Sequence, residues 1–154
     1  MYLKQRELTA VSYISPESSV LDIGCGDGQF MKLLELIGCN VKGVEIEKDR
    51  VAIAQQRGLD VVCSDANDYD LSQSFDWVVF NHSICYTGVD LLKNLKTKKI
   101  LIYSTRDHVK GIKQALKSLG YKVSYKYASY FGRYMPYIPG SYLLCYSLML
   151  IAEK

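Results

Sequence analysis

The sequence predicts an α/β protein: a doubly wound, mostly parallel seven-stranded sheet with helices on both faces and a C-terminal antiparallel β-hairpin. Short apolar runs alternate with segments of helical periodicity over most of the chain. Near the end, two further runs have no helix-length segment between them. A turn with three glycines follows the first run, which suits a strand that bends sharply into a helix. These patterns together indicate strand–helix units that end in a hairpin.

The leading segment is expected to form a helix within residues 1–15, ended by the break at Ser15 and Pro16. At 154 residues the chain is expected to be one domain with one core. No run reaches the roughly 18 apolar residues of a membrane span, and the N-terminus lacks the apolar core of a signal peptide. We therefore expect a cytoplasmic protein without membrane contact.

Five apolar runs predict the parallel strands, and four periodic segments predict further helices. The strands are expected at residues 19–23, 40–46, 59–64, 76–81 and 99–104. The helices are expected at residues 29–37, 50–57, 89–95 and 106–119. Within the terminal region, residues 121–154, the segments 122–130 and 142–152 are expected to pair as the hairpin.

The cysteines and histidines do not predict a metal site or a disulfide framework. The five cysteines are scattered and form no C-x-x-C pair, which fits reduced thiols that pack as small apolar side chains. His82 and His108 are the only histidines, so a histidine-based metal centre is not expected.

Charge and tyrosine content set the C-terminal part apart. Residues 1–90 have a balance of −7 and residues 91–154 a balance of +10. Eight of the 13 tyrosines lie between Tyr121 and Tyr146. Two readings stay open: a solvated basic face with packed tyrosines, or a surface for RNA or another anion. The partners left open are a small-molecule or nucleic-acid substrate and a homodimer or partner subunit.

The glycine turn is the most specific motif. It reads Asp-x-Gly-x-Gly-x-Gly over residues 22–28. A dinucleotide-binding G-x-G-x-x-G would require glycine at Gln29, and a P-loop would require a following Gly-Lys-Ser/Thr, which is absent. The spacing therefore favours a different nucleotide-like ligand.

This motif resembles the first motif of the class I S-adenosylmethionine (SAM) dependent methyltransferases. The resemblance implies SAM as the cofactor. It places Gly24, Gly26 and Gly28 in the cofactor-binding loop, beside a helix N-terminus that can hold the SAM carboxylate. It gives Asp22 the role of supporting the loop or facing the SAM ammonium group.

The resemblance also assigns roles at the next two strand ends. Glu45 corresponds to the acidic residue that accepts hydrogen bonds from both ribose hydroxyls. Asp65 corresponds to the residue that meets the adenine amino group, and the backbone N–H of Ala66 to the donor for a ring nitrogen.

The fourth strand end is expected to face the transferable methyl group. Asn81 is a candidate for cofactor binding and for orienting the acceptor, and His82 is a candidate general base because its free pKa lies near neutrality. Tyr86 is a candidate pocket residue. The Asn/Asp-Pro-Pro-aromatic pattern of amino-group methyltransferases is absent here.

Within the class, residues 43–61 look most like the MetW-like methyltransferases, and the chain is expected to depart from them after Asp65. The resemblance implies a minimal SAM-dependent methyltransferase with an unidentified acceptor. Two alternatives remain: a SAM-binding subunit that is non-catalytic or partner-dependent, and a nicotinamide-binding protein. The nicotinamide alternative is disfavoured by Gln29, which stands where the dinucleotide-binding motif has its third glycine, and by the terminal hairpin.

Overall fold

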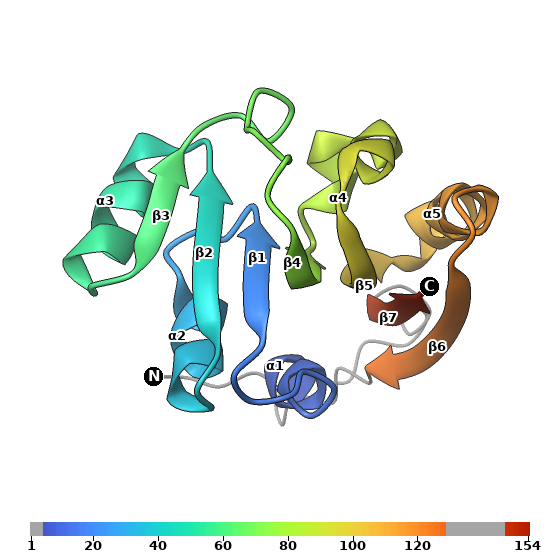
Figure 1. Cartoon of the computed structure of the whole chain (residues 1–154), viewed down its shortest axis with the longest axis horizontal. Coiled ribbons are helices and arrows are strands. Elements are labelled where there is room, and N and C mark those ends of the chain that lie inside the picture. The colour runs from blue at the N-terminus through green and yellow to red at the C-terminus, as the bar shows by residue number, and fades with distance from the viewer. Residues whose placement is uncertain (1–4, 129–146) are drawn as a thin grey trace, which may run out of the picture.

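The computed structural model describes residues 5–128 and 147–154 (Figure 1). One sheet runs through the described chain in the order β3-β2-β1-β4-β5-β7-β6. The strands are β1 Ser19–Ile23, β2 Asn40–Glu45, β3 Asp60–Cys63, β4 Phe75–Asn81, β5 Thr97–Thr105, β6 Lys122–Ala128 and β7 Ser147–Glu153. The helices are α1 Gln5–Val11, α2 Gln29–Leu36, α3 Lys48–Gln56, α4 Ile84–Thr87, α5 Arg106–Ser118 and the 3-10 helix η1 Val89–Asn94.

The predicted fold class is confirmed. Strands β1 to β5 pair in parallel, and β7 pairs antiparallel with both β5 and β6. The terminal hairpin therefore has the expected orientation, but its second strand inserts between β5 and the first. The expected strand residues 129–130 and 142–146 lie outside the described residues.

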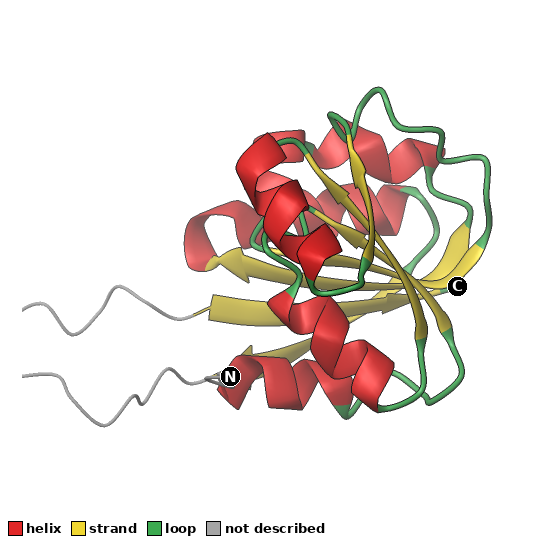
Figure 2. Ribbon diagram, turned by 90° about the vertical axis from the view of Figure 1, so that its left-hand side faces the viewer, coloured by secondary structure: helices red, strands yellow, loops and turns green. Residues whose placement is uncertain are grey.

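Helices pack on the sheet (Figure 2), and one apolar layer lies on each of its faces. On one face, Phe30 and Leu34 of α2 and Ala54 of α3 pack against alternate strand residues. On the other, Ile84 and the buried side of α5, represented by Leu116, pack against the intervening strand residues. Because both faces are buried, the central strands are mostly apolar, as parallel strands usually are, with Asp22 of β1 as a buried exception.

The chain reverses its direction of travel across the sheet between β1 and β4. From β1 it proceeds to β2 and β3 on one side, and then crosses back to β4 on the other side of β1. Within the described residues, the crossover from β3 to β4 contains turns and no helix. In open α/β sheets, ligands bind beyond the carboxyl ends of the strands at such a reversal. The topology thus predicts a ligand site beyond the carboxyl ends of β1 and β4.

Several element boundaries differ from those expected. Helix α3 begins at Lys48 rather than residue 50, and the expected helix at 89–95 is a 3-10 helix. The short α4 has no predicted counterpart. No helix in the described parts of the chain combines the length and apolar character needed to cross a membrane.

Candidate functional site

A cavity of about 460 Å³ lies at the carboxyl ends of β1, β2, β3 and β4. We call it the strand-end cavity. Seven of the candidate residues named from the sequence line it, and they come from four different segments of the chain. They are Gly24, Glu45, Asp65, Ala66, Asn81, His82 and Tyr86.

The glycine loop, residues 24–28, joins β1 to α2, and each of its glycines has a positive φ. Gly24, at φ 73°, lines the cavity, and a Cβ there would lie 2.4 Å from the Cβ of Ser83. The N–H of Gly24 donates to the Val44 carbonyl at 2.8 Å. Gly24 therefore lets two loops approach closely beneath the cavity.

Gly28 serves packing rather than the cavity. It precedes the first residue of α2 at φ 77°, and a Cβ there would lie 2.2 Å from Cδ1 of Leu59. Gly26, at φ 59°, is also absent from the cavity lining, but its N–H points to a residue that lines it.

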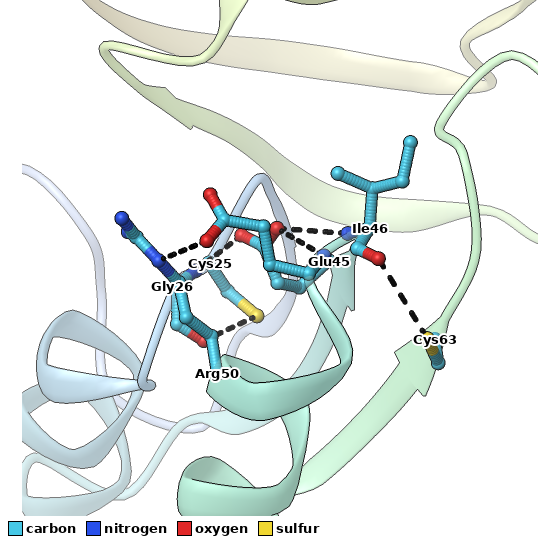
Figure 3. A network of polar contacts seen from close by, with 7 residues as sticks. Cys25, Gly26, Glu45, Ile46, Arg50 and Cys63 are labelled. Carbon is cyan, nitrogen blue, oxygen red and sulfur yellow. Dashed lines mark hydrogen bonds and ion pairs between the residues drawn. The ribbon is translucent and has the colours of Figure 1, made fainter.

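Glu45 connects the end of β2 to the glycine loop (Figure 3). Its Oε2 accepts a hydrogen bond from the N–H of Gly26 at 2.8 Å. Its Oε1 accepts from the N–H groups of Ile46 at 2.8 Å and Glu47 at 2.9 Å. The side chain is buried, and a carboxylate can accept about four hydrogen bonds. The Glu45 carboxylate can therefore accept about one more hydrogen bond, whereas the expected pair of ribose hydroxyls requires two.

Asp22 lies below the cavity rather than in its lining. The residue is 1% exposed, and within the described residues neither carboxylate oxygen has a hydrogen-bond partner. Burial, together with the nearby Glu45 carboxylate, raises the pKa of Asp22 from 3.8 to about 7. The same buried environment raises the pKa of the Cys25 thiol, which is therefore a neutral packing group.

Asp65 begins a tight turn after β3. Its Oδ1 accepts hydrogen bonds from the backbone N–H of Asn67 at 2.8 Å and from Nδ2 of Asn67 at 3.0 Å. These two hydrogen bonds fix the carboxyl group of Asp65, and its Oδ2 can still accept a hydrogen bond from another donor. In the described structure, the N–H of the neighbouring Ala66 makes no hydrogen bond, so an acceptor and a donor stand side by side at the cavity wall.

The segment after β4 forms the opposite wall. His82 adopts φ 64°, which is uncommon for a residue with a side chain, and its N–H donates to the Tyr103 carbonyl at 3.0 Å. Its ring stacks on that of Tyr103 with centroids 6.2 Å apart. The Ser83 hydroxyl donates to the Ile23 carbonyl, which ties this wall to β1. Asn81 Oδ1 is buried without a partner in the described chain.

Tyr86, which was expected in the pocket, lies at the rim of the cavity with 90% of its surface exposed. Ile46, also at the rim, is 60% exposed.

Several lining residues are not among the candidates from the sequence. The unexpected members lie within a predicted strand, shortly after a predicted strand end, or in the following helix. They are Val44, Ile46, Glu47, Arg50, Ser64, Asn67, Ser83 and Thr87. Extending each predicted strand end by two or three residues would have identified Glu47, Asn67 and Ser83.

Metal-ligating side chains do not gather in this region. Nowhere in the described ranges do three or more His, Cys, Asp or Glu residues come together in a way that could hold a metal ion.

Solved structures with the same fold include several methyltransferases. The magnesium protoporphyrin IX methyltransferase ChlM from Synechocystis PCC 6803, solved with bound SAM, is 18% identical, with a TM-score of 0.77 over 97% of this chain and 78% of that chain. A SAM-dependent methyltransferase from Archaeoglobus fulgidus is 20% identical, with a TM-score of 0.76 over 97% and 91%. A TehB-like SAM-dependent methyltransferase from Corynebacterium glutamicum is 18% identical, with a TM-score of 0.75 over 99% and 89%. These likenesses establish the shared fold.

No curated protein matches the chain. The family model described as methionine biosynthesis protein MetW matches residues 5–103. Our expectation that the chain departs from this family after Asp65 is therefore wrong for β4 and the segment that follows it. Those residues form the buried centre of the sheet, where many apolar exchanges preserve the same pattern. Because the match covers more than half of the chain, the protein belongs to the MetW family.

Proposed function

We propose that the protein binds SAM in the strand-end cavity and transfers its methyl group to an acceptor. One observation carries this proposal: Gly24, Glu45 and the Asp65–Ala66 pair line one cavity from three adjacent strand ends. A volume of about 460 Å³ is within the range of small-molecule and cofactor sites. SAM bound to the solved ChlM structure, which has this fold, supports the choice of ligand.

The polar groups of the cavity fit the chemistry of SAM. Gly24 lines the cavity, and because Ser83 fills the place of a Cβ there, the glycine brings the loop after β4 against the glycine loop and closes the cavity wall. Asn81 Oδ1, a buried acceptor without a partner in the described structure, suits an ammonium or hydroxyl donor. Asp65 Oδ2 and the Ala66 N–H offer the acceptor–donor pair that an adenine edge requires.

Glu45 would accept one ribose hydroxyl in its present conformation. Accepting the second requires it to release one of its backbone donors, Gly26 being the one contributed by the other loop. In this proposal Glu45 both shapes the glycine loop and binds the sugar. Its removal therefore affects the affinity for SAM through two routes.

Bound SAM supplies an electrophilic methyl group on a sulfonium. The residues of the chain hold the ligand, align the acceptor and exclude water. Asn81 and His82 stand at the end of the cavity formed by β4, where Asn81 can orient an acceptor. His82 can accept a proton if the acceptor must lose one, and its stacking on Tyr103 fixes the ring plane.

Calorimetric titration with SAM tests the proposal, with Glu45→Ala as the variant and Asp49→Ala as the matched control. Asp49 is an exposed carboxylate in the first turn of α3 and does not line the cavity. We expect Glu45→Ala to weaken SAM binding by about 2 kcal/mol and Asp49→Ala by much less. Absence of binding at millimolar SAM in the folded wild-type protein would refute the proposal.

A second candidate is a SAM-binding subunit that transfers the methyl group only with a partner. The exposed rim favours it, because Tyr86 and Ile46 present large apolar surfaces that a second protein could cover. Labelled SAM incubated with RNA, protein and small-molecule fractions of an extract distinguishes the two candidates. Labelling by the purified chain alone supports the enzyme. Labelling only after a protein fraction is added supports the subunit.

A further inference from the structure

A second cavity, of about 680 Å³, opens at the amino ends of β1, β4 and β5, at the far edge of the sheet from the strand-end cavity. We call it the lysine groove. Four lysines line it. They are Lys96, Lys98, Lys99 and Lys154.

The topology brings these lysines together from distant parts of the chain. Lys154 is held beside β5 by its N–H, which donates to the Lys98 carbonyl at 2.9 Å. Its ammonium lies 4.4 Å from the centre of the Tyr121 ring, and the Tyr121 hydroxyl donates to the Thr97 carbonyl at 2.8 Å. The backbone that carries the charges is therefore fixed by hydrogen bonds.

The lysines of the groove outnumber the carboxylates in and around it. Within the described residues none of its four lysines forms an ion pair. Its only carboxylate belongs to Asp76, whose Oδ2 already accepts two hydrogen bonds at 2.8 Å from the N–H and the hydroxyl of Ser19. Asp70 and Glu153 lie nearby, Glu153 opposite Lys99 in the strand register, and both oxygens of Asp70 accept hydrogen bonds from Ser72. Four lysines therefore face three acidic groups, of which Asp70 and Asp76 are engaged by serines, and a small excess of positive charge remains.

The lining favours a backbone of phosphates over a membrane or a protein. Its aromatic residues Phe75 and Trp77 are buried, and Lys99 covers the Trp77 ring at 5.2 Å. No large apolar residue that the described chain exposes lies in the groove, so it offers neither a membrane-inserting side chain nor an apolar anchor for a protein. Lysines act as point charges that suit phosphates without reading bases.

We propose that the lysine groove binds the phosphodiester backbone of a nucleic acid without sequence preference. The groove and the strand-end cavity are separated by the length of β4, about 20 Å. A nucleotide whose phosphate is held in the lysine groove is therefore too far from the strand-end cavity to enter it. This proposal does not depend on SAM binding.

The test is the salt dependence of binding to a 20-nucleotide single-stranded RNA of mixed sequence and to DNA of the same sequence. The variant is Lys96→Gln with Lys98→Gln, and the control is Lys32→Gln with Lys110→Gln, which removes the same charge elsewhere. Losing two phosphate contacts should lower the slope of log K against log salt by about 1.4 and weaken binding about tenfold or more. RNA and DNA should bind alike, because lysine contacts to phosphates do not involve the 2′-hydroxyl.

We expect the control to bind like the wild type, and both variants to keep wild-type melting temperatures and SAM titrations. Equal losses in the two variants would overturn the proposal, since binding would then depend only on net charge. Stronger binding to phosphatidylserine vesicles, with the same dependence on Lys96 and Lys98, would overturn it in favour of a membrane surface.

Discussion

Asp22 is a buried residue of β1 that lies opposite Gly43 of β2 and Val79 of β4 in the register. Because burial raises its pKa from 3.8 to about 7, the folded protein keeps a proton that the unfolded chain loses between these two values. The free energy of unfolding should therefore fall as the pH rises from about 4 to 7, by at most about 1.4 kcal/mol per pH unit.

Asp22→Asn removes this titration. We expect the variant to gain stability relative to the wild type between pH 5 and pH 8, because the wild type loses the contribution of the protonated acid and the amide does not. Urea unfolding at the two pH values measures the effect. If the variant and the wild type differ in unfolding free energy by the same amount at pH 5 and pH 8, Asp22 does not titrate between these pH values in the folded protein.

Gly24 and Gly28 occupy equivalent backbone conformations and have different surroundings. We expect both alanine variants to be less stable than the wild type by roughly 1–3 kcal/mol, because each places a Cβ at positive φ. Only Gly24→Ala should also abolish SAM binding, since Gly24 lines the cavity and Gly28 contacts Leu59. Chemical unfolding and calorimetry on the folded variants separate the two effects. If both folded variants bound SAM as the wild type does, the close approach of Gly24 and Ser83 would not be needed for the site.

At the scale of the elements, the strands differ in how many neighbours they have. Strands β1, β2, β4, β5 and β7 each pair on two sides, whereas β3 is a four-residue edge strand. We expect amides of β1 and β4 to exchange hydrogen only on global unfolding and those of β3 to exchange through local opening. Hydrogen exchange followed by mass spectrometry gives the comparison. Equal protection of β3 and β1 would show that the edge unfolds with the core.

The sequence predicts the elements whose ends carry a physical signal. The bounds of β1 match residues 19–23 because an apolar run meets glycine there. Helix α4 was missed because four residues are too few to show a period. The place of β7 could not be predicted either, since a hairpin pattern specifies that two strands are neighbours and not which of them meets β5.

Some residues of the site could likewise be placed from the sequence, and others could not. Glu45, Asp65 and Asn81 could be placed at one edge because parallel strands end together. Asp22 could not be assigned to the cavity or to the core, because both faces of the sheet are buried and alternation gives no distinction. The hydrogen bond from Gly26 to Glu45 depends on how two loops meet, which no local pattern contains.

For the molecule as a whole, a ligand that binds only the folded state raises the melting temperature. At 100 times its dissociation constant, SAM should add about 2.7 kcal/mol to the free energy of unfolding. For a chain of this size, that corresponds to roughly 5–10 °C. Thermal unfolding with SAM, and with NAD as the control ligand, measures it. An equal shift with NAD would revive the nicotinamide alternative.

The position of β7 between β5 and β6 has a consequence for how the protein is made. A ribosome releases β6 before β7, yet β6 meets the rest of the sheet only through β7. Until the last strand emerges, the nascent chain therefore carries an open edge along β5, flanked by side chains that are buried in the finished protein, such as Ile100 and Ile102. During that interval a chaperone, or the same edge of a neighbouring nascent chain, can occupy the place of β7.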